Sequence, residues 1–275
     1  MAEDTKIGGL HMSRNHNRPP KDPRRRPHIP TLGTTCRQLR DHRGLSRAQA
    51  CRSSGLSASY LFSIEECDQM PSSEVLDQII AAYHLDPKQA RHLRELRAPA
   101  ENLEPTHVLR QRVTGNTRRM AHLHDLASRD VLAAYVDPVW NVLASNNLFR
   151  TALRGIDEIG SVPVWLFSTM AEDVVVDLPH EADHVVAICK AILGRYRASQ
   201  QAADLLRRLG TNKQFQERWA ASIRIAYGRD TSDPLRLRDP VSGVVTAYTL
   251  SVSDETNNVL LLTGLAKPHS LPEFS

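Results

Sequence analysis

The sequence has only four cysteines, and no two of them form a C-x-x-C pair. Cys36, Cys51, Cys67 and Cys189 also follow no regular spacing, so the sequence indicates neither a zinc cluster nor a disulfide framework. We therefore expect reduced thiols, most of them buried.

Long apolar runs are missing as well. No segment reaches the roughly 18 apolar residues that a membrane helix needs, and the N-terminal residues lack the apolar core of a signal peptide. A glycine-rich phosphate loop and a G-x-S-x-G nucleophile motif are also absent. We expect a cytoplasmic protein that contacts no membrane, has no catalytic residues and needs no cofactor.

The length and charge distribution of the chain indicate more than one part. At 275 residues it exceeds a typical single domain of about 100–150 residues, and 41% hydrophobic residues can form a core. Residues 1–29 are rich in proline and arginine, and seven basic residues face three acidic ones within the first thirty. We expect a disordered basic arm that attracts phosphate groups, the alternative being a solvated tail.

Residues 30–98 have the pattern of a helical bundle with short connections. Leu32, Cys36 and Leu39 recur at helical spacing, Ser46 and Ser57 are suited to cap helix starts, and Gly55 is suited to end a helix. Helices are predicted over residues 31–44, 46–55, 57–66, 72–85 and 86–97.

The unit between Leu45 and Pro71 has two helices joined by a tight turn at Gly55, which is the helix-turn-helix arrangement. In that arrangement the second helix enters the major groove of DNA. Ser57, Ala58 and Ser59 are small enough to leave room at the groove end of this helix, and Ile64, together with Leu61, is suited to its buried face.

The chain here resembles the XRE (lambda-repressor-like) family, on Leu45-Ser46, Gly55, Ser57, Ser59-Tyr60-Leu61, Ile64-Glu65 and Pro71. The resemblance implies a phosphate contact from Arg47 and an inward-facing, structural Glu65. Ala50, Ala58 and Cys67 depart from the family pattern. The implied DNA contacts are Arg47, Ser57, Ala58, Ser59, Tyr60, Phe62 and Ser63, with Arg24, Arg25 and Arg26 of the arm adding backbone or minor-groove contacts.

After a linker over residues 99–106, helical and strand-like patterns mix. Residues 131–147 predict a hairpin around Asp137-Pro138 followed by a short helix, and residues 180–220 predict further helices. Strands are predicted over residues 221–228, 233–240, 243–254 and 257–265. This order favours an α+β domain with an antiparallel sheet.

The second part resembles the C-terminal domain of MmyB-like transcription regulators, with Tyr135, Trp140, Asn146, Phe215 and Trp219 as the matching anchors. The resemblance implies two domains: an all-α lambda-repressor-like helix-turn-helix bundle (30–98), then an α+β PAS-like ligand-binding domain (107–268) and a short tail (269–275). It also implies a deep apolar pocket for a small ligand such as a fatty acid.

Aromatic residues, Tyr227 among them, concentrate where the sheet and helices are expected to meet. They either line such a pocket or fill a core. The candidate pocket residues are Tyr135, Trp140, Phe149, Trp165, Phe167, Trp219 and Tyr248, with Arg195 or Arg224 for a ligand carboxylate.

HEADH at residues 180–184 satisfies the H-E-x-x-H zinc-protease signature. Pro179 places the motif at a helix start, Asp183 puts a charge where a metal helix is usually apolar, and only Glu217 is a conceivable third ligand. We therefore favour a solvated first helical turn over a metal site, and a zinc hydrolase remains an alternative.

Together these patterns predict a ligand-responsive regulator that binds a double-stranded DNA operator as a homodimer. The resemblance implies an activator, with RNA polymerase as a further partner. The remaining alternative is a protein-interaction module that does not bind DNA.

Overall fold

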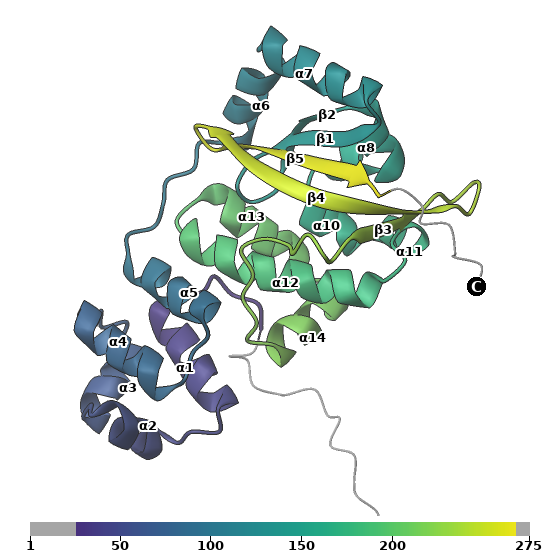
Figure 1. Cartoon of the computed structure of the whole chain (residues 1–275). Helices are drawn as coiled ribbons and strands as arrows, with labels where there is room; N and C mark the ends of the chain where they lie inside the picture. Colours follow the sequence, from purple (N-terminus) through teal and green to yellow (C-terminus); the bar gives the residue numbers. More distant parts are fainter. Residues whose placement is uncertain (1–25, 268–275) are drawn as a thin grey trace, which may run out of the picture.

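The computed structural model describes residues 26–267, apart from the side chain of Thr256 (Figure 1). A group of five helices, here called the helical domain, precedes a part built on a five-stranded sheet, here called the sheet domain. This confirms the predicted fold class of a helical bundle followed by an α+β domain. Arg24, Arg25 and the predicted tail (269–275) lie outside the described residues.

The helical domain consists of α1 (Leu32–His42), α2 (Arg47–Ser54), α3 (Ala58–Glu66), α4 (Ser73–Ala82) and α5 (Pro87–Arg97). The predicted caps are confirmed: the side chain of Ser46 accepts a hydrogen bond from the amide of Gln49, and Ser57 accepts one from Tyr60. Gly55 ends α2 at a φ of 75°, which glycine adopts without steric cost. Leu61 and Ile64 are fully buried, as predicted.

The packing of α1 against α3 depends on Gly33. A Cβ atom at this position would lie 2.4 Å from the carbonyl oxygen of Ile64. Because that neighbour is backbone, no side chain rotation can relieve the contact. Glycine therefore lets the first turn of α1 lie directly on the end of α3.

The end of α3 explains why Cys67 is tolerated where the XRE pattern has glycine. Cys67 itself has a φ of −114°, and the left-handed residue is the next one, Asp68, at 52°. Aspartate adopts this conformation more readily than most residues do.

The sheet domain has the strand order β2-β1-β5-β4-β3, with every neighbouring pair antiparallel. Its strands are β1 (Val131–Val136), β2 (Val142–Ser145), β3 (Leu235–Arg238), β4 (Val245–Thr256) and β5 (Val259–Ala266). The predicted hairpin at Asp137-Pro138 joins β1 to β2, and α8 (Asn147–Ala152) is the predicted short helix after it.

Helices cover both faces of this sheet (Figure 1). On one face, α6 (Thr106–Thr114) and α7 (Thr117–Ser128) pack on Ala133 and Tyr135 of β1. On the other, Leu132, Ala134 and Val136 pack against residues of α8 and of the helices that follow it. These are α9 (Ile156–Ile159), α10 (Val162–Leu166), α11 (Thr169–Val174) and α12 (Leu178–Arg195), with α13 (Gln200–Leu209) and α14 (Lys213–Ala221) outside them.

The strand predicted over residues 221–228 is wrong. This segment continues from α14 without joining the sheet, and the amide of Ala226 donates to the carbonyl of Ala187 in α12, 3.1 Å away. Its alternating apolar residues therefore reflect contacts with helices on two sides. Between residues 26 and 267, no helix is both long and apolar enough to cross a membrane.

Candidate DNA-binding surface and effector cavity

The N-terminal end of α3 is exposed, as a recognition helix requires. Ser57, Ala58 and Ser59 are exposed there, Tyr60 is half-buried, and the Phe62 ring is 46% exposed. The Ser63 hydroxyl donates to the backbone carbonyl of Ser59 at 3.0 Å, so toward a base it offers mainly its acceptor lone pairs.

Glu65 faces inward and anchors α3 to the two preceding helices. Its carboxylate is fully buried and accepts hydrogen bonds from Arg40 on both oxygens, at 2.6 and 3.0 Å. Arg47 adds a third bond of 2.9 Å. The inward position that the XRE resemblance implies for Glu65 is thus observed, and the carboxylate is neutralised within the bundle.

Arg47 belongs to the same cluster of charged side chains as Arg40 and Glu65. Its guanidinium also donates to Glu66 and lies 5.0 Å from the centre of the Phe62 ring. Glu66 accepts a further bond from Arg37 at 2.5 Å. One third of the Arg47 side chain is exposed. A DNA phosphate would therefore share the Arg47 guanidinium with Glu65 and Glu66. The two carboxylates are paired and leave this edge without net negative charge.

A cavity of about 500 Å³ is lined mainly by the sheet domain, between β4, β5, α12 and the segment that follows α14. This volume falls within the range of roughly 300–1,000 Å³ typical of small-molecule sites. Its apolar walls include Trp140, Trp165, Leu166, Ile188, Leu250 and Leu262.

The charged residues that line the cavity are the pair of Glu181 and Arg229, the two arginines Arg91 and Arg195, and Asp254. Glu181 and Arg229 form a buried bidentate pair in its wall, at 2.5 and 2.6 Å. Arg195 and Arg91 are partly exposed, which places them where the cavity opens to solvent. Arg195 is held by Glu101 at 2.6 Å, and Arg91 by Glu95 at 2.9 Å. Both arginines are thus already paired, and Asp254 adds a carboxylate to the same lining, so an anionic group would have to share the two guanidinium groups with Glu95 and Glu101.

The structure brings together only some of the residues predicted for this pocket. Trp140, Trp165 and Arg195 line the cavity, and Phe149 and Tyr248 belong to the adjoining core. Arg224 is exposed and does not line it.

Two of the predicted aromatic residues lie elsewhere, which differs from the sequence interpretation. Tyr135 points to the α6 and α7 face, because alternate residues of β1 face opposite sides of the sheet. Trp219 packs against Phe215 in a separate core, with ring centres 5.5 Å apart. Phe167 does not line the cavity either, and it contacts both this core, through Phe215 at 5.3 Å, and the core beside the cavity.

The sequence patterns did not indicate Arg91 or Arg229 as lining residues. Arg91 comes from α5 of the helical domain, so no local pattern could connect it with the cavity. Arg229 directly follows the segment that was wrongly predicted as a strand.

The HEADH residues have partners that do not suit a zinc protease. Glu181 is committed to Arg229, and His180 contacts both oxygens of Asp233 at 3.1 Å. His184 is buried, and burial lowers its pKa to about 4. The expected solvated turn is therefore wrong for Glu181 and His184. Across residues 26–267, no group of three or more potential ligands could hold a metal ion.

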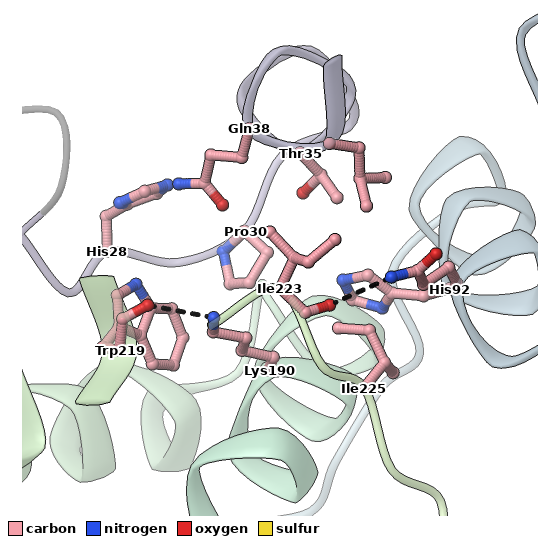
Figure 2. Close-up of a pocket in the computed structure, with 11 residues that line it drawn as sticks. His28, Pro30, Thr35, Gln38, His92, Lys190, Trp219, Ile223 and Ile225 are labelled. Atoms are coloured by element: carbon pink, nitrogen blue, oxygen red, sulfur yellow. Dashed lines mark hydrogen bonds between the residues drawn. The ribbon is translucent and has the colours of Figure 1, made fainter. Parts of the chain in front are cut away.

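A second, much smaller hollow lies between the two domains and is shown in Figure 2. Lys190 of α12 donates to the carbonyl oxygens of Trp219, at 3.0 Å, and Ser222. His28 approaches the Trp219 ring from the N-terminal side, with 6.4 Å between ring centres. The exposed Arg26 of the predicted arm is two residues before this contact.

Comparison with protein families assigns both parts of the chain. Residues 31–93 match the helix-turn-helix domain family, and residues 119–270, more than half of the chain, match the MmyB-like transcription regulator ligand binding domain. A search of curated proteins gave no significant match. With an exposed helix start in the first part and a cavity in the second, the chain belongs to the MmyB-like transcription regulators, which join a DNA-binding helix-turn-helix to a ligand-binding domain.

Proposed function

We propose that the protein is a cytoplasmic transcriptional activator, without catalytic activity, that binds its operator as a homodimer and responds to a fatty acid or similar apolar anion. The cavity carries this proposal, because its walls are apolar and arginines stand at its opening. Apolar walls favour an acyl chain through burial of its surface, and the arginines favour a carboxylate. RNA polymerase is the partner that an activator would recruit.

The ligand part of the proposal predicts a loss of binding when the cavity is filled. Ile188→Trp adds bulk to a cavity-lining position, and we expect the affinity for dodecanoate to fall by about tenfold or more. The measurement is isothermal titration calorimetry on the full chain. Ala203→Trp, at an exposed position of α13, is the matched control and should bind as the parent protein does. Equal affinities for the two variants would contradict the assignment of this cavity.

The DNA part predicts that charge at the groove end of α3 is not tolerated. Ser59→Glu places a carboxylate in the first turn of a helix, where it suits the helix dipole but faces DNA phosphates. We expect operator affinity to fall by about 10–100-fold.

The operator is first recovered by selecting genomic fragments on the purified protein, and a palindromic motif is expected for a homodimer. Thr117→Glu is the control, since it makes the same kind of change at the exposed start of α7. If both variants bind the operator alike, α3 is not the recognition helix.

A further inference from the structure

The effector cavity is not confined to the sheet domain. Arg91 lies on α5 of the helical domain, yet it lines the cavity. Its guanidinium stacks 3.8 Å from the centre of the Tyr227 ring, which belongs to the segment after α14. Such a stacked cation is stabilised by the electrons of the ring face. The DNA-binding part of the chain therefore forms part of the ligand-binding surface.

The contact between Arg91 and Tyr227 is part of a larger connection between the domains. The Tyr227 hydroxyl donates to Glu95 of α5 at 2.6 Å, and the same carboxylate pairs with Arg91. Earlier in the segment, the Gln89 side chain of α5 donates to the carbonyl of Ile223 at 3.4 Å. The segment 223–229 is thus bonded to α5 at Ile223 and Tyr227, and its residues 226–229 also line the cavity.

Direct helix packing fixes the same arrangement. His92 and Leu96 of α5 lie against Gly194 of α12. A Cβ atom at Gly194 would come within 2.6 Å of the His92 ring and 3.0 Å of Leu96. Glycine at this position therefore permits the close approach of α5 to α12 that brings Arg91 to the cavity opening.

We propose that the helical domain completes the effector site, with Arg91 and Arg195 together binding the ligand's anionic group, so that the ligand favours the docked arrangement of the two domains. This inference rests on the proposed function, since it names how the same cavity is regulated. Arg195 is on α12 and Arg91 on α5, so only the docked arrangement brings both cations to one cavity. Each is paired with a glutamate, and Asp254 lines the same cavity, so the ligand's anionic group competes with these carboxylates for the arginines.

The coupling follows from linkage. A ligand shifts an equilibrium between two arrangements only by its difference in affinity for them. Here that difference is the interaction with Arg91, which the undocked arrangement lacks. By reciprocity, any change that separates α5 from α12 must lower the affinity of the protein for the ligand.

The test measures dodecanoate affinity by calorimetry on full-length variants. Arg91→Gln removes the cation, and we expect affinity to fall by about tenfold, the size of one charge-assisted hydrogen bond. Arg94→Gln is the control, because Arg94 is on the same helix but is exposed and pairs with Asp77 of α4. Affinity for dodecanol, which has no charge, should be unchanged by Arg91→Gln.

A second variant tests docking without touching the anion contact. Gly194→Leu should push α5 away from α12 and weaken dodecanoate binding although both arginines remain. Parent-like affinity in both Arg91→Gln and Gly194→Leu would overturn the shared site, and if Ile188→Trp still lost affinity the cavity itself would stand. A parent protein that fails to bind dodecanoate would remove the proposed ligand and this inference together.

Discussion

Arg40→Met is expected to lower the free energy of unfolding by about 3–5 kcal/mol, the cost of breaking a buried ion pair from one side. Arg40 supplies two of the three hydrogen bonds to the buried Glu65 carboxylate. Its removal leaves that carboxylate with Arg47 alone, which is one-third exposed. Urea unfolding of the full chain at neutral pH, followed by far-ultraviolet circular dichroism, measures the loss.

Two further variants distinguish the effect of the buried Arg40–Glu65 pair from that of the neighbouring surface ion pair. Arg37→Met removes a surface partner of Glu66 and should cost no more than about 1 kcal/mol. Arg40→Met combined with Glu65→Leu removes both buried charges and should recover much of the stability, because no unpaired charge remains. If Arg40→Met costs no more than Arg37→Met, Glu65 does not anchor α3 as described.

The same cluster connects stability with DNA recognition. Glu65 is on α3, Arg40 on α1 and Arg47 on α2, so one carboxylate holds all three helices. The exposed serines at the start of α3 owe their orientation to this buried end. We infer that the carboxylates of α3 serve the scaffold, and that their negative charge is largely hidden from an approaching phosphate.

The local features of the helical domain could be predicted because its signals are local. Ser46, Gly55 and Ser57 determine where helices begin and end by bonding within a few residues. The hydrogen-bond partners of Glu65 could not be predicted from local signals, because Arg40 is 25 positions away in the sequence. Only the family resemblance indicated that this side chain faces inward.

The sheet domain shows where sequence patterns become ambiguous. All six residues of β1 are buried, so no alternation of polar and apolar residues revealed that Tyr135 faces away from the cavity. The segment 221–228 alternates as a strand does, yet its partners are α5 and α12. Arg91 joined the cavity through docking of two domains, which a one-dimensional pattern does not encode.

Acidification is expected to loosen the contact between the domains, and His92 is the main cause. The ring is 1% exposed, its Nδ1 has no hydrogen-bond partner, and burial lowers its pKa to about 3 from an ordinary 6.5. Lys190 and Arg197 lie close enough to lower it further. Since this pKa is depressed, the unfolded or undocked state binds the proton more tightly. The stabilisation is full above about pH 6.5 and is lost as the pH falls toward 3.

At pH 5 the loss from His92 should be about 2 kcal/mol. His184, whose pKa is lowered to about 4, acts in the same pH range but from within the sheet domain. A donor and acceptor dye pair, one in each domain, should therefore report separation on acidification, and His92→Leu should shift that transition to lower pH. His184→Leu is the comparison, because it removes an acid-sensitive group without touching α5. Identical transitions in the parent protein and His92→Leu would show that protonation of His92 does not separate the domains. If the domains of His92→Leu separate at a lower pH and those of His184→Leu do not, the acid sensitivity lies at the contact between α5 and α12, which also brings Arg91 to the cavity.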